Sequence, residues 1–136
     1  MERLETNTHQ DHVIAHVVGA TVLGTYSWDE TLYLLLDIGF IWNIYLNCEM
    51  GLVPHPVAVA ELELSDEIKN RLRGDVDALL TGSGEVHHFL PVGVEPIGSV
   101  ELFDSGDTRE IHIFCGDQIL KVKTNLNDRT ISASLR

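Results

Sequence analysis

The stretch REIHIFCGDQILKVKT, residues 109–124, constrains the fold of this chain more than any other part of its sequence. The dipeptide Gly-Asp at 116–117 separates two runs in which apolar and polar residues alternate. Alternation on both sides of a two-residue Gly-containing loop is the pattern of a β-hairpin. We therefore expect two antiparallel strands here.

The two-residue loop also predicts the register of this hairpin. Cys115 should face Gln118, and counting outward should bring Glu110 opposite Lys123, where the two side chains could form a cross-strand ion pair. The same register gathers the branched apolar residues on one face, which we expect to be buried. These residues are Ile111, Ile113, Leu120 and Val122.

Two further alternating segments flank the hairpin. GSVELF at 98–103 precedes it through the turn DSGDT, and TISASL at 130–135 follows it through NLNDR. Turn-forming residues between short alternating segments are typical of consecutive antiparallel strands. The C-terminal third should therefore form a four-stranded β-meander.

Residues 65–80, SDEIKNRLRGDVDALL, favour an amphipathic helix. Ser65 suits the N-cap, and acidic residues follow it in the first turn, where the helix dipole favours them. Apolar residues recur at helical spacing. They are Ile68, Leu72, Val76, Leu79 and Leu80. Before the helix, VAVAELEL at 57–64 alternates as a half-exposed strand would.

The apolar region nearer the N-terminus is less clear. GFIWNIYLN at 39–47 favours a strand through its aromatic and β-branched residues. For residues 29–38, a capping box from Ser27 to Glu30 would start a helix, whereas Thr31 and the residues after it favour a strand. We take a strand and leave the helix open.

These elements indicate an α+β fold: a mostly antiparallel sheet with a C-terminal β-meander and one main amphipathic helix (65–80) packed on it. A short N-terminal helix (9–18) is a further candidate. We expect residues 1–136 to form a single domain, with 1–8 as a flexible tail. One helix hardly covers both faces of such apolar strands, which favours a homodimer.

Composition narrows the range of partners. The net charge is −12, from 21 acidic and 9 basic residues, and binding to a phosphate backbone needs clustered Lys and Arg. Nucleic acid is therefore a poor partner, and we expect none. The acidic surface either favours a basic protein partner or serves only to keep the protein soluble. No apolar run is long enough to span a membrane. The polar start and the absence of paired cysteines indicate the cytoplasm.

THQDHVIAH, residues 8–16, carries three histidines. If Thr8 caps a helix, with Asp11 three residues on, His9, His12 and His16 share one face, about 60° wide, and the valines lie on another. As a strand, His12 and His16 would still share a face. Imidazoles near a helix N-terminus stay neutral and available as metal ligands.

A metal site needs three or four ligands, and no acid follows these histidines in the HExxH arrangement. His12, His16 and His88 are the candidate ligands, with zinc as the candidate metal, but a polar helix face or a subunit contact is the simpler interpretation. If the three imidazoles converge within about 4 Å of a point, a metal site follows.

Two classes of function remain, and whether the chain is an enzyme is left open. The first is a non-catalytic binding or accessory protein that acts through protein contacts, since no complete catalytic motif is present. The alternative is a small metal-dependent hydrolase that uses His12, His16 and His88.

Overall fold

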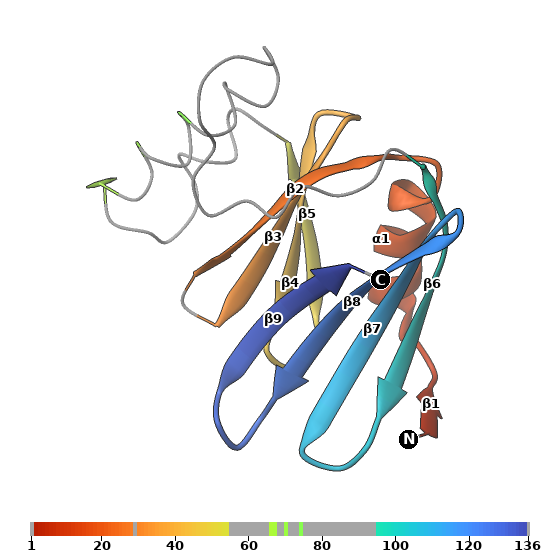
Figure 1. Cartoon of the computed structure of the whole chain (residues 1–136), viewed down its shortest axis with the longest axis vertical. Helices are drawn as coiled ribbons and strands as arrows, with labels where there is room; N and C mark the ends of the chain where they lie inside the picture. The colour runs from red at the N-terminus through yellow and green to blue at the C-terminus, as the bar shows by residue number, and fades with distance from the viewer. Residues whose placement is uncertain are drawn as a thin grey trace.

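The computed structural model describes residues 2–28, 30–54 and 95–135, together with Asp66, Glu67, Asn70 and Gly74. These residues form two antiparallel sheets and the helix α1 (Figure 1). The fold is therefore α+β and mostly antiparallel, as the sequence predicts. The elements are β1 (Glu2–Leu4), α1 (Thr8–Val17), β2 (Val22–Trp28), β3 (Thr31–Leu36), β4 (Phe40–Tyr45), β5 (Met50–Pro54), β6 (Ile97–Asp104), β7 (Thr108–Cys115), β8 (Gln118–Asn125) and β9 (Thr130–Leu135).

The five-stranded sheet has the order β1-β6-β7-β8-β9 and contains the predicted meander. The predicted hairpin register is confirmed along its whole length, from Cys115 opposite Gln118 to Glu110 opposite Lys123. The expected core face is also confirmed, because all four of its branched apolar residues are buried.

The predicted ion pair from Glu110 to Lys123 is not the contact that Glu110 makes. Its carboxylate instead lies 3.5 Å from the amine of Lys121, which is two residues from its register partner. A diagonal neighbour on an adjacent strand is within reach of a long side chain, so correct register does not decide which lysine is bound.

Within residues 1–8, for which we expected a flexible tail, the structure places a short strand. Glu2–Leu4 forms β1 and pairs with Leu102–Asp104 of β6. The partner strand is about a hundred residues away in the sequence, and no local pattern signals such a partner.

The second sheet has the order β2-β3-β4-β5. Strand β3 settles the ambiguity over residues 29–38 in favour of a strand, and β4 confirms the strand expected within 39–47. Every residue of β3 is buried, so both of its faces are covered. A strand buried on both faces has a continuous apolar sequence, which explains why the run of leucines shows no alternation.

One hydrophobic cluster joins the two sheets. Leu34 and Trp42 of the second sheet belong to the same buried cluster as Ile113 and Leu120 of the first. Val13 and Val17 of α1 complete it. In Figure 1 the helix lies between β5 and β6, and it contacts both strands, so it closes one side of the space between the sheets.

The N-cap of helix α1 lies one residue before the predicted one, and the helix itself begins at Thr8. Asn7, not Thr8, is the N-cap, and its side chain accepts a hydrogen bond from the backbone N–H of Gln10 at 2.7 Å. The Gln10 side chain accepts one from the backbone of Asn7 in return, at 3.0 Å. This capping box uses an amide where the prediction used the carboxylate of Asp11.

Several predicted elements lie wholly or partly outside the described residues. The predicted strand at 57–64 lies outside them, and so does most of the predicted helix at 65–80. The candidate ligand His88 also lies outside the described residues. The four described positions within that helix are all helical. In the part of the chain that the structure describes, no helix is long and apolar enough to cross a membrane.

Candidate functional site

The helix histidines do not form a metal centre with one another. His12 and His16 are exposed, because α1 turns Val13 and Val17 into the core. His9 donates a hydrogen bond from its Nε2 to the carbonyl oxygen of Met50 at 2.7 Å, which attaches the helix to β5.

Among the described residues, no group of three or more His, Cys, Asp or Glu side chains could hold a metal ion. His88 lies outside those residues, so the predicted site of His12, His16 and His88 remains a prediction. The shared, outward-facing position of His12 and His16 agrees with the helical interpretation.

A hollow in the described part of the chain lies where β1 leaves the sheet. Strand β1 pairs with only the last three residues of β6, after which the chain turns away through residues 5–7 to begin α1. At the other end of β6, Ile97 exchanges backbone hydrogen bonds of 2.8 Å with Gly19 and Ala20. Residues 98–101, between these two attachments, have no strand beside them on this side within the described residues.

Figure 1 shows β1 beside only the lower end of β6. The space next to it, between β6 and α1, is a groove of about 600 Å³, a size that is common for ligand sites. The groove is lined by Arg3, Leu4, Glu5, Thr6, Asp11, Ile14, Val100, Glu101 and Leu102.

The floor of this β6–α1 groove is apolar. Leu4, Ile14 and Val100 are partly buried hydrophobic residues that pack against the main cluster. They come from β1, α1 and β6, so the edge of the core is accessible where these three elements meet. Burial of such a surface by a ligand would be favourable, at roughly 25 cal/mol for each Å² removed from water.

The rim of the groove is acidic. It carries the carboxylates of Glu5, Asp11 and Glu101 against the single guanidinium of Arg3, a formal charge of −2. Arg3 lies 3.5 Å from Glu101, so the one cation is already paired. The Thr6 hydroxyl donates a hydrogen bond to Asp11 and joins the loop to the helix. The rim therefore favours a cationic ligand.

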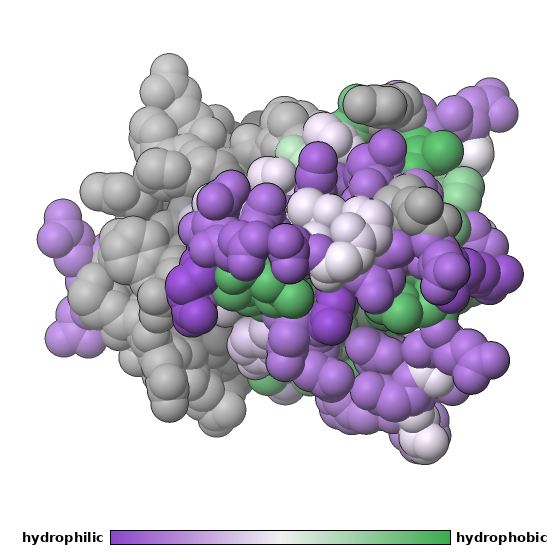
Figure 2. Space-filling model, turned by 90° about the horizontal axis from the view of Figure 1, so that it is seen from below, coloured by the Kyte–Doolittle hydropathy of each residue, from purple (hydrophilic) through white to green (hydrophobic). Residues whose placement is uncertain are grey.

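A second and smaller hollow, of about 390 Å³, lies among the hairpin turns at the opposite end of β9 from the C-terminus. Figure 2 shows that end of the molecule as largely hydrophilic, with small separate hydrophobic patches. Its two charged lining residues bind each other: Arg129 donates two hydrogen bonds of 2.6 Å to the carboxylate of Glu30. Because these two charges bind each other, this hollow has no excess charge to attract a ligand, whereas the groove has an excess of carboxylates.

The cysteines are unsuited to nucleophilic chemistry. Cys48 and Cys115 are both buried and free, and burial raises the pKa of each thiol. Since the thiolate is the nucleophile, a raised pKa makes both residues poorly reactive.

Comparison of the chain with protein-family models, with curated proteins and with solved structures found no match. The groove is therefore the feature from which a function can be inferred. Sequence reasoning missed the groove, although the alternation in GSVELF correctly separates Val100 from Glu101. The missing information was the pairing of residues 2–4 with β6.

Proposed function

We propose that this protein is a non-catalytic binding protein that takes an extended, basic segment of a partner protein into the groove between β6 and α1. The observation that carries the proposal is the edge of β6 at residues 98–101, which has no neighbouring strand among the described residues and lies beside an apolar floor and an acidic rim. The backbone N–H and C=O groups of a strand edge bind extended peptides by strand addition.

The geometry suggests the pattern of the bound segment. Four residues of β6 span about 13 Å, room for three or four residues of an added strand. Successive side chains of a strand point to opposite faces. One set would meet Leu4, Ile14 and Val100, and the other set would meet the carboxylates. A segment in which small apolar residues alternate with Lys or Arg fits both.

We expect this binding to be weak and sensitive to salt. A contact of this length lies below the standard interface of about 1,600 Å² and belongs with transient complexes. Charges on an exposed rim mainly raise the association rate, and salt screens them.

Fluorescence anisotropy with a labelled peptide of alternating Lys and Val tests the proposal. Asp11→Asn removes one rim charge and keeps an acceptor for Thr6, so we expect affinity to fall about two- to fivefold, which corresponds to about 0.5–1 kcal/mol. The matched control is Asp117→Asn, at an exposed residue of the β7–β8 turn, which should bind as the unaltered protein does.

Backbone recognition is tested with two N-methylated forms of the same peptide. In an added strand, alternate amides face the sheet edge, so methylation of one set should abolish binding and methylation of the other should weaken it far less. Equal effects of the two forms, or equal affinity for a peptide of alternating Glu and Val, would contradict the proposal.

A further inference from the structure

On the outer face of the five-stranded sheet, the charged and aromatic side chains are only partly exposed to solvent. Ile111, Ile113 and Leu120 point into the core, so the residues that alternate with them point away from it. We use the name outer sheet face for the surface formed by Glu101, Phe103, Glu110, His112, Phe114 and Lys121.

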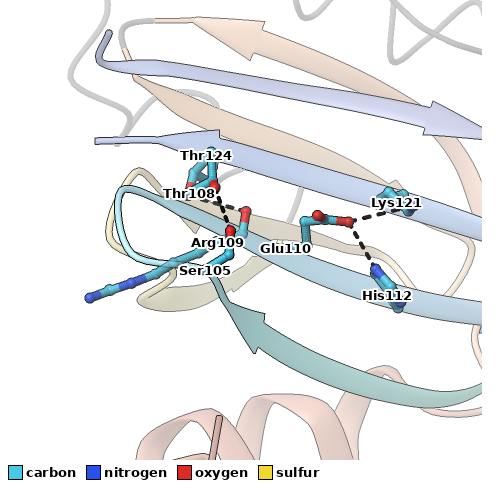
Figure 3. A network of polar contacts seen from close by, with 7 residues as sticks. All are labelled: Ser105, Thr108, Arg109, Glu110, His112, Lys121 and Thr124. Carbon is cyan, nitrogen blue, oxygen red and sulfur yellow. Dashed lines mark hydrogen bonds and ion pairs between the residues drawn. The ribbon is translucent and has the colours of Figure 1, made fainter. Parts of the chain in front are cut away.

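Charged side chains at the centre of this face form a compact network (Figure 3). The Nε2 atom of His112 donates a hydrogen bond to Glu110 at 3.1 Å, and Lys121 lies 3.5 Å from the same carboxylate oxygen. The side chains of Glu110 and His112 are only 14% and 15% exposed. The hydrogen bond from His112 and the nearby Lys121 hold the pKa of Glu110 below its ordinary value.

Aromatic rings surround this network. The ring of His112 lies 4.5 Å from that of Phe103 and 6.3 Å from that of Phe114, measured between centroids. Aromatic residues around a sequestered polar centre are typical of the central part of protein interfaces. Because Glu110 is already paired and largely shielded from water, covering it costs less than covering a free carboxylate.

The charges on this face suit a second copy of the same chain. With a net charge of −12, two copies repel each other over most of their surface. On the outer sheet face, however, acids and bases are close to balanced: Glu110 on β7 lies beside Lys121 on β8, and Glu101 on β6 lies beside Arg3 on β1. Lys123 of β8 lies on the same face. Two such faces can therefore meet with opposite charges in contact.

We propose that two copies of this chain pair through their outer sheet faces about a two-fold axis parallel to β7. That rotation exchanges the β6 and β8 sides, so Lys121 of each copy lies opposite Glu101 of the other. Lys121 and Glu101 both flank His112 in the same row of the sheet, which makes the two contacts simultaneous. A contact surface that both copies share is the usual form of a two-fold dimer.

The size of the face is adequate for such a dimer. Strands β6, β7 and β8 have eight residues each, β9 has six and β1 has three. At about 3.3 Å per residue and about 4.8 Å between strands, they give a projected area on the order of 500 Å². A standard interface buries about 800 Å² of accessible surface on each partner. Because side chains roughen the surface, the accessible area exceeds the projected one, so the two values are comparable.

The test is light scattering on the full chain with two charge reversals. Lys121→Glu and Glu101→Lys each place like charges opposite one another at both contacts, so each protein alone should have the monomer mass of 15.2 kDa. Mixed together they restore both opposite-charge contacts, and we expect about 30 kDa. Asp117→Lys, off the face, is the control and should dimerise like the unaltered protein.

Since Lys121→Glu brings a carboxylate toward Glu110, a second variant guards against simple unfolding. Ser99→Arg adds a large side chain at an exposed position in the row of Phe114 and should also prevent dimerisation, with a native circular-dichroism spectrum. A monomeric mass for the unaltered protein at all concentrations would overturn the proposal. Dimers of either reversal alone would also overturn it.

Discussion

Single side chains in this protein act mainly through partners on neighbouring strands. Glu110 shows this best, because its carboxylate is bound by His112 on its own strand and by Lys121 on the next. Sequence reasoning placed both residues in the correct register and on the correct face. It selected the wrong lysine, since side-chain reach and sheet twist decide between a direct and a diagonal neighbour.

The lowered pKa of Glu110 predicts a pH-dependent contribution to stability. The folded protein holds the carboxylate ionised below its ordinary pKa of 4.5, so the stabilisation is present above that value and is lost as pH falls through the folded pKa. Glu110→Gln should lower the free energy of unfolding by about 1–2 kcal/mol at pH 7. This difference should shrink below about pH 4.5 in urea titrations.

The control for Glu110 is Glu2→Gln, which removes a carboxylate from the exposed end of β1. Its free energy of unfolding at pH 7 should stay within about 0.5 kcal/mol of that of the unaltered protein. A loss for Glu110→Gln that stays constant from pH 7 to pH 3 would refute the assigned role of the ionised carboxylate.

The predicted metal site is testable at the same scale. If His12 and His16 bind zinc together with His88, zinc should raise the melting temperature, and the double variant His12→Ala/His16→Ala should abolish that rise. If both proteins melt at the same temperature with and without zinc, the metal-dependent hydrolase is excluded as an alternative.

The strands and the helix differ in how far along the chain the residues lie that determine them. Strands β7 and β8 follow from their own sequence, because a two-residue loop sets the register of the hairpin. Local sequence signals also favour helix α1. They do not decide between the neighbouring N-cap candidates Asn7 and Thr8. Strand β1 is different, since its three residues have a strand partner only after β6 is in place.

The start of α1 gives a prediction for an element. Asn7→Ala removes the side chain that accepts from the backbone of Gln10, so we expect a loss of about 1 kcal/mol in the free energy of unfolding. Thr8→Ala, at the first helical residue, should change stability by a few tenths of a kcal/mol. Chemical denaturation measures both, and a larger effect at Thr8 would show that the predicted cap is the real one.

At the scale of the whole molecule, the two proposed surfaces are adjacent but separable. The groove uses the part of β6 at residues 98–101 that has no strand beside it on the β1 side among the described residues, and the dimer uses the outer face of the sheet. Glu101 contributes to both, whereas Asp11 belongs to the groove alone and Lys121 to the outer sheet face alone. Asp11→Asn should therefore leave dimerisation intact, and Lys121→Glu should leave peptide binding intact, so failure of one proposal is distinguishable from failure of the other.

The sequence by itself determined the class of the fold and the C-terminal meander with its register. These features follow from neighbours within a few residues, where periodicity and loop length leave few alternatives. Only the tertiary structure decided that residues 2–4 pair with β6, that β3 is buried on both faces, and that a groove opens beside α1. Those features depend on which segments, far apart in the sequence, pack against each other in the folded core. A local sequence pattern does not specify such long-range contacts.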